Sequence, residues 1–344
     1  MDFGFSDEQR AIKETAREML ANRSPLAKVR QAAESRTYDD ALWREICELG
    51  WPGIAIAEGH GGQGLGMVEL AILCEELGYA CAATPFLSNA SAGIFIERAG
   101  SDQQRERWLA GIASGEGRGA AAFQPRSNDL VPDAEGAAAL VLNDGDRAVV
   151  VGGSDAQIEP VELIDATRSY ANVSASAGDP LPGEVEAAAD RSVVALAAEL
   201  TGIAQRALEI AVEYANERQQ FGRPIGAYQA VSHRCAGMLY ETEEARSLTY
   251  YAAWCADAEP ESLPLAASMA KARASEAAWR VTNNAIQVLG GIGFTWEHDI
   301  HFLLKRAKVG AELLGDARLH RERVASLAGL AATSATHRAV QNPR

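Results

Sequence analysis

The sequence RQQFGRPIGAYQ, residues 218–229, separates two long helical patterns and decides the fold. Gly222 and Pro224 interrupt the helical pattern and predict a rigid turn. Arg218 and Arg223 flank this turn, and glutamines accompany them. Guanidinium and amide groups on one turn can hold a phosphate or a planar heterocycle. A helix–helix corner with a buried phenylalanine and solvated arginines is the alternative interpretation.

A second glycine-rich stretch, QVLGGIGF at residues 287–294, follows another helical pattern. One glycine is enough to end a helix, so Gly290 alone predicts a C-cap. Gly291 and Gly293 add backbone without side chains, which favours close approach by a ligand or another subunit. The stretch does not match a strand–turn–helix dinucleotide fingerprint, because a helix closes before the glycines.

The predicted fold class is α+β, mostly α. Residues 1–117 show helical patterns, with Ser6 as a predicted N-cap. Residues 188–330 carry apolar side chains at spacings of three and four, and the joints between these patterns are short. They predict an up-down bundle of four long helices. Residues 331–344 are expected to be a tail.

Residues 118–187, between these helical regions, predict a small β domain. Short β-branched runs on either side of Asp144 and Gly145 indicate a hairpin. Further short strands are expected in AQIEPVELID and SYANVSASAG. The segment DPLPGEVEAAAD is interpreted as the linker into the bundle.

Composition excludes several classes of partner. The formal net charge is -15, and such an acidic surface repels nucleic acid. No stretch is apolar for the roughly 18 residues that a membrane span needs. The first residues lack the basic and apolar regions of a signal peptide, so a cytoplasmic protein is expected.

Neither the cysteines nor the histidines predict a metal site. The motif HDIH contains His298 and His301 but has no second ligand pair nearby. It is interpreted as a set of polar residues at a helix start. Five cysteines, at spacings that fit no common metal site, are expected to be reduced: Cys47, Cys74, Cys81, Cys235 and Cys255.

The pairing of RQQFGRPIGAYQ with QVLGGIGF resembles the acyl-CoA dehydrogenase family. The stretches LGWPGIAIAEGHGGQGLG, at residues 49–66, and CEELGYACAATPF, at residues 74–86, are similar to that family as well. The resemblance covers nearly the whole chain. It implies a helical N-terminal domain, a β middle domain and a C-terminal four-helix bundle.

The resemblance also implies FAD at a subunit interface and α,β-dehydrogenation of an acyl-CoA thioester. Electrons then pass to an electron-transfer flavoprotein. By motif, one set of residues contacts the phosphates and adenine of a neighbouring subunit's FAD: Arg218, Gln220, Phe221 and Gln229. A second set lines the adenosine side: Gln287, Gly290, Gly291 and Gly293. A shared dinucleotide implies at least a dimer.

The β domain departs from the family pattern because it is short. Family members carry a Thr-Glu-Pro stretch and a Trp-Ile-Thr stretch that cover the flavin ring, and neither is present. Gln124 and Pro125 stand where the first is expected. The chain is therefore not expected to enclose an isoalloxazine ring by itself.

The catalytic base is also missing from its usual place. Many members carry a glutamate before Gly-Thr in the turn that matches Leu314, Gly315 and Asp316. Leucine cannot accept a proton. Asp316 replaces the threonine that touches flavin, and a carboxylate there would be repelled by FAD phosphates.

Other members place the base at the start of the first bundle helix, just before an arginine. Asp190, followed by Arg191, offers such a base, and an N-cap is its alternative role. Counting back without gaps from Phe221 reaches Ser192 instead, and two residues are about 200° of helix rotation. Glu199 is a further ionisable candidate that can equally pair with an arginine of the bundle.

Three hypotheses follow. In the leading one, the chain is the short subunit of an α2β2 acyl-CoA dehydrogenase, of the kind that acts on steroid side-chain CoA thioesters, and a full-length partner supplies the base. In the second, the chain is a self-sufficient homo-oligomeric dehydrogenase with Asp190 as base. In the third, it is a non-catalytic scaffold.

Overall fold

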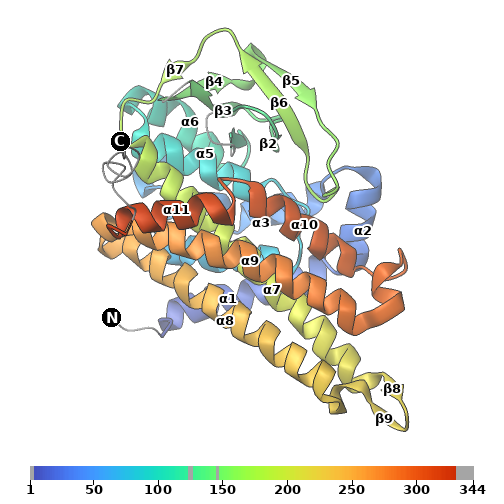
Figure 1. Cartoon of the computed structure of the whole chain (residues 1–344). Helices are drawn as coiled ribbons and strands as arrows, with labels where there is room; N and C mark the ends of the chain where they lie inside the picture. The colour runs from blue at the N-terminus through green and yellow to red at the C-terminus, as the bar shows by residue number, and fades with distance from the viewer. Residues whose placement is uncertain (1–3, 123–126, 145–146, 331–344) are drawn as a thin grey trace, which may run out of the picture.

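A small β region lies at the top of the molecule, over helices from both ends of the chain (Figure 1). The computed structural model describes residues 4–122, 127–144 and 147–330. Gly145, Gln124, Pro125 and the expected tail at 331–344 lie outside these residues. The N-terminal helices are α1 (Asp7–Arg23), α2 (Leu26–Ser35), α3 (Asp40–Glu48), α4 (Met67–Tyr79), α5 (Phe86–Ala99) and α6 (Asp102–Ser114).

The N-terminus of α1 is fixed by a capping box. The Ser6 hydroxyl accepts a hydrogen bond from the Gln9 amide, and the Gln9 side chain accepts one from the Ser6 amide. Two backbone donors that the helix leaves unpaired are thereby satisfied. The predicted N-cap at Ser6 is confirmed.

The β region forms two small sheets above the bundle (Figure 1). One sheet has the order β1-β3-β4-β7, with β1 (Gly119–Ala121), β3 (Ala139–Asp144), β4 (Arg147–Gly152) and β7 (Asp179–Pro180). The other has the order β2-β6-β5, with β2 (Val131–Pro132), β5 (Ala156–Pro160) and β6 (Tyr170–Ala175). Strands β3 and β4 pair antiparallel with Asp144 opposite Arg147, so the predicted hairpin is confirmed.

The bundle consists of α7 (Val185–Glu217), α8 (Gln229–Ala258), α9 (Leu263–Leu289) and α10 (Ile300–Glu312). A further helix, α11 (Ala317–Leu327), packs on α9. Helix α7 begins within the segment that was interpreted as a linker, so that interpretation is wrong for residues 185–190. The predicted fold class, mostly helical with a small β region, is confirmed.

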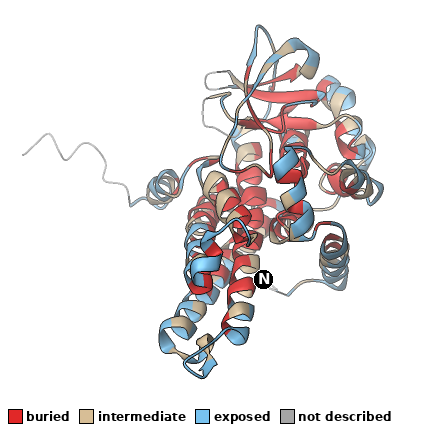
Figure 2. Ribbon diagram, turned by 90° about the vertical axis from the view of Figure 1, so that its right-hand side faces the viewer, coloured by how far each residue is buried: buried red, intermediate tan, exposed pale blue. Residues whose placement is uncertain are grey.

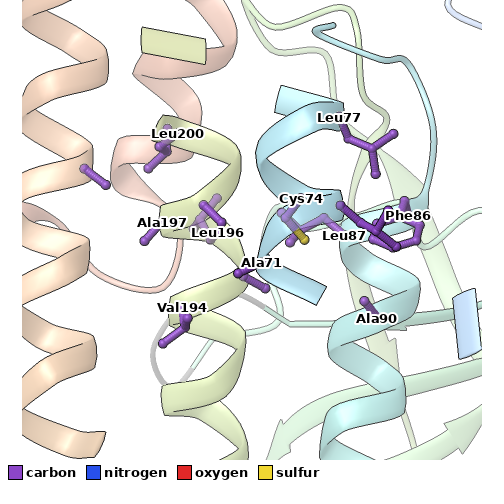
Figure 3. Close-up of a cluster of buried hydrophobic side chains, with 14 of the residues drawn as sticks. Ala71, Cys74, Leu77, Phe86, Leu87, Ala90, Val194, Leu196, Ala197 and Leu200 are labelled. Atoms are coloured by element: carbon purple, nitrogen blue, oxygen red, sulfur yellow. The ribbon is translucent and has the colours of Figure 1, made fainter. Parts of the chain in front are cut away.

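The core lies where α4 and α5 meet α7. Figure 3 shows Cys74 and Leu77 of α4, Phe86 of α5 and Leu196 of α7 converging between the helices. Each is less than a tenth exposed. Such close packing makes α7 the central helix of the molecule, and Figure 2 shows burial along its middle.

Candidate functional site

The RQQFG segment forms a hairpin at the far end of α7 and α8 (Figure 1). Strands β8 (Gln219–Gln220) and β9 (Arg223–Pro224) pair, which leaves Phe221 and Gly222 as a two-residue turn. Both have positive φ, 53° for Phe221 and 80° for Gly222, as a type I′ turn requires. The left-handed backbone conformation is strained for a phenylalanine. Local conformational propensity therefore does not explain why Phe221 occupies the tip of the turn.

The hairpin presents its side chains to solvent. Phe221 is 93% exposed, and Arg218, Gln220 and Gln229 are also exposed. Figure 2 shows exposed and intermediate residues around this lower tip. The expectation of a buried phenylalanine, which belonged to the plain-corner interpretation, is therefore wrong in this chain.

Tyr228 organises the base of the hairpin. Its hydroxyl donates to the Gln220 carbonyl oxygen at 3.1 Å, and its ring lies 4.1 Å from the Arg223 guanidinium carbon. The Phe221 ring meets Tyr228 edge-on with centroids 6.5 Å apart. These contacts hold the tip in one shape without covering Phe221.

The glycines that follow α9 have different roles. Gly290 has a φ of 65° and caps α9. A Cβ at Gly290 or Gly291 would meet no atom within 4 Å. At Gly293 it would lie 2.8 Å from the Leu289 Cβ, so packing inside the chain explains that glycine. Open space lies over Gly290 and Gly291, beside the exposed Gln287.

The hairpin and the 290–294 segment lie at separate places at the ends of the bundle (Figure 1). Each presents a polar or bare-backbone surface to solvent. The chain thus presents two separate candidate half-sites for a ligand.

The turn after α10 keeps a special backbone. Leu314 has a φ of 58° and Gly315 a φ of 95°. The Leu314 side chain packs against the main core and carries no ionisable group. Asp316 is the N-cap of α11, where its side chain accepts from the Leu319 amide at 2.8 Å. Asp316 therefore has a structural function in starting α11.

Two buried side chains hold this turn through its carbonyl oxygens. Nζ of Lys271 donates to the Gly315 oxygen at 2.9 Å, and Nε2 of His320 donates to the Leu314 oxygen at 2.9 Å. Burial lowers the pKa of His320 to about 4. Neither residue was expected from the sequence, although Lys271 lies on the same helix face as the buried Ala267, Ala274 and Ala278.

Asp190 lies inside α7, not at its start. The helix begins at Val185 and its N-cap position is Glu184, so the N-cap interpretation of Asp190 is wrong. Both carboxylate oxygens are held by Arg323 of α11, one at 2.9 Å from Nη2. Burial raises the pKa of Asp190, although Arg323 acts in the opposite direction.

Ser192 and Glu199 are the other α7 residues considered at or near the position of the base. Both are buried, and their side-chain oxygens have hydrogen-bond partners. The Ser192 hydroxyl donates to the Ala188 oxygen at 3.1 Å. Glu199 accepts from Arg168 at 2.8 Å and lies 3.5 Å from Nη1 of Arg306. Burial favours the neutral acid, but the two arginines outweigh it and hold the pKa of Glu199 below its usual value. Arg306 comes from the bundle and Arg168 from the β region.

An open cleft of about 870 Å³ lies between the start of α7 and the segment before α9. Asp190 and Arg191 line it, together with Arg147, Leu181 and Leu263. Among the candidate acids, only Asp190 borders this space. Its bidentate pairing with Arg323 occupies both of its carboxylate oxygens.

Within the described residues, no group of three or more potential ligands is placed to hold a metal ion. Nδ1 of His298 accepts from the Ile300 amide at 3.1 Å, which is a structural role at the start of α10. The five cysteines are all free thiols. No helix in the described part of the chain is long and apolar enough to cross a membrane.

Comparisons with known proteins place these features in a family. Residues 6–116 match the acyl-CoA dehydrogenase N-terminal domain, and residues 185–328 match the acyl-CoA dehydrogenase C-terminal domain. The acyl-CoA dehydrogenase IpdE2 of Mycolicibacterium smegmatis is 35% identical over 91% of this chain and 96% of its own length. The chain belongs to the acyl-CoA dehydrogenase family. It is thus an oxidoreductase chain of the class that acts on CH–CH bonds.

Solved structures share the fold. A steroid acyl-CoA dehydrogenase variant, Tcur3481-Tcur3483, superposes with a TM-score of 0.87 at 28% identity, over 94% of this chain and 98% of the other. The ChsE4-ChsE5 complex from Mycobacterium tuberculosis superposes with a TM-score of 0.89 at 22% identity, over 97% of this chain and all of that one. Both likenesses show that the chain has the fold of these proteins.

Proposed function

We propose that this chain is the short subunit of an α2β2 FAD-dependent acyl-CoA dehydrogenase whose full-length partner supplies the catalytic base. The observation that carries the proposal is the turn at Leu314 and Gly315. It keeps a left-handed backbone and two buried hydrogen bonds, yet it has no acid.

The residues present fit a dinucleotide. Arg218 and Arg223 can neutralise phosphates, Phe221 can stack on a heterocycle, and Gly290 and Gly291 leave space for close approach. Gln220, Gln229 and Gln287 add amide groups at the two half-sites. Bound FAD supplies the acceptor for the electron pair that leaves Cβ of the acyl group as a hydride.

The missing proton acceptor favours the heteromer over a self-sufficient enzyme. Dehydrogenation needs a carboxylate that removes the Cα proton. Asp190 is tied to Arg323, Glu199 is tied to Arg168 and Arg306, and Leu314 has no acid. In this proposal Gly315 and Leu314 shape the wall of the site, and the partner's base acts across the interface.

We further propose that the substrate is a steroid side-chain CoA thioester and that an electron-transfer flavoprotein reoxidises the enzyme. Support for the substrate is the similarity to a structure named as a steroid acyl-CoA dehydrogenase, at 28% identity. A panel of steroid and straight-chain acyl-CoA thioesters, followed by bleaching of the flavin absorbance, tests this. Equal rates on both classes would contradict it.

The central experiment compares the chain alone with the chain co-expressed with a full-length family member from the same operon. We expect stoichiometric FAD and turnover only in the co-purified complex. Arg218→Gln is expected to lower its flavin content, whereas Arg318→Gln, at a side chain 83% exposed on α11, is the matched control. Full FAD and turnover in the chain alone would support the homo-oligomer with Asp190 as base. Flavin content unaffected by Arg218→Gln would support the scaffold.

A further inference from the structure

The amino group of Lys271 is enclosed by the turn that follows α10. Lys271 lies in the N-terminal half of α9 and is fully buried, with an exposed fraction of 0%. Its Nζ lies 2.9 Å from the Ser275 hydroxyl, 3.0 Å from the Ala311 oxygen and 2.9 Å from the Gly315 oxygen. Removing an amino group from water costs free energy unless hydrogen bonds replace its contacts with water, and these three contacts do so.

The two carbonyl groups that Lys271 binds lie on either side of the left-handed residue Leu314. Ala311 belongs to the last turn of α10, whose carbonyls have no helical partner. Gly315 is itself buried and precedes the N-cap of α11. Without Lys271, both oxygens would lose a hydrogen bond inside the protein, which destabilises the closed turn.

We propose that Lys271 is a positioning residue that holds the Leu314–Gly315 turn in place for the dehydrogenation reaction. His320 secures the same turn from the other side through the Leu314 oxygen. The link to the reaction rests on the proposed function, whereas the hold on the turn rests on these contacts alone.

The neutral and charged forms of Lys271 can both satisfy these partners. A neutral amine donates two hydrogen atoms to the two carbonyls and accepts from the Ser275 hydroxyl, and an ammonium donates to all three. Burial lowers the pKa of Lys271 to about 7, although the charges of Glu312 and Asp316 oppose this shift. The amino group therefore changes its charge near neutral pH while the turn stays closed.

The neighbouring His320 and Arg323 do not change their charge in the pH range in which Lys271 does. His320 has a pKa of about 4, lowered by burial, and is neutral above pH 6. Arg323 is held charged, with its pKa raised by the hydrogen bonds to Asp190. Glu312 and Asp316 are the acids that face Lys271 from α10 and from the start of α11.

The sign of the pH effect follows from linkage. When the turn opens, Lys271 enters water and regains a pKa of about 10.4, so the open form binds a proton that the closed form lacks above pH 7. Raising the pH from 7 therefore favours the closed turn. Protection of its amides from exchange is expected to increase by up to about tenfold per pH unit, the limit for one proton.

Hydrogen exchange of the full chain, corrected for intrinsic rates, tests the proposal between pH 6 and pH 9. In the wild type, peptides covering residues 313–320 should gain protection above pH 7. Lys271→Met should abolish this pH dependence and speed exchange in these peptides at least tenfold. Ser268→Ala is the matched control, because Ser268 is also buried on α9 but contacts Arg323 and not the turn.

Protection independent of pH in the wild type would overturn the proposal. So would retained protection in Lys271→Met. If Lys271→Met does not fold, the wild-type series decides, together with Ser275→Ala, which should weaken protection less. A reduced turnover of the co-purified complex with Lys271→Met, at unchanged KM, ties the turn to the reaction. If that wild-type complex lacks FAD and turnover, the proposed function fails while the exchange result still judges Lys271.

Discussion

Arg323 of α11 donates hydrogen bonds to both carboxylate oxygens of Asp190, which lies on α7 more than a hundred residues earlier. The Asp190 carboxylate is almost fully buried, whereas the Arg323 side chain is 31% exposed. The pair therefore fastens the last described helix to the central helix of the bundle. This pairing gives Asp190 a structural role, and substitution of Asp190 tests whether it has a catalytic role instead.

Asp190→Asn removes the negative charge and leaves Arg323 without its partner. We expect a loss of about 1–3 kcal/mol in the free energy of unfolding, measured by urea denaturation. Turnover of the co-purified complex should stay within a few-fold of the wild type, because the carboxylate is a structural partner. A loss of turnover of a hundredfold or more, with stability and flavin content unchanged, would instead identify Asp190 as the base.

Glu199→Gln should be the most damaging of the single substitutions on α7. It leaves Arg168 and Arg306, both buried, without a shared acceptor of negative charge. Removing one member of a buried ion cluster costs about 3–5 kcal/mol. The control Glu322→Gln, at a side chain 70% exposed, should change stability by less than about 0.5 kcal/mol. Equal urea midpoints for the two variants would refute this role of Glu199.

Gly291→Ala and Gly293→Ala distinguish a ligand-facing glycine from a packing glycine. At Gly293 the new methyl meets the Leu289 side chain at 2.8 Å, so we expect a cost of about 1–3 kcal/mol. At Gly291 it meets no atom of this chain within 4 Å, and stability should change by less than about 0.5 kcal/mol. Only Gly291→Ala should lower the flavin content of an otherwise stable complex. Thermal unfolding and flavin absorbance of both variants test this pair.

His320 predicts how stability depends on acid pH. Its pKa is lowered to about 4 in the folded chain by burial, and an unfolded histidine has a pKa of about 6.5. Between these values the unfolded chain binds the extra proton, so stability falls as the pH drops from 6.5 towards 4. His320→Gln should flatten this part of the curve of urea midpoint against pH. The control substitution is His233→Gln, at an exposed histidine outside the packed interior.

Local patterns were enough to predict the fold class. The capping box at Ser6, the β3–β4 hairpin and the long apolar stripe of α7 depend on residues close in sequence. Their periodicity and turn chemistry act before any tertiary contact forms. The motifs at 218–229 and 287–294 likewise led to the family, which the comparisons then showed.

The boundary of α7 was harder to predict, because local residues suggested two answers. Prolines and a glycine favoured a linker up to Asp190, and an aspartate there suited an N-cap. In the structure α7 extends back to Val185. The Asp190 carboxylate binds Arg323, a residue remote in sequence, and is therefore not available to cap a helix N-terminus.

The sequence by itself determined the order of the helical and β regions, the turn at residues 218–229 and the absence of an acid at Leu314. Tertiary structure alone decided the partners of the charged residues. Glu199, Arg168 and Arg306 come from α7, the β region and α10. Lys271 of α9 binds Gly315, which lies in the turn between α10 and α11. A charge far from its partner in sequence leaves no periodic signal, and only the packed fold brings the two close enough to interact.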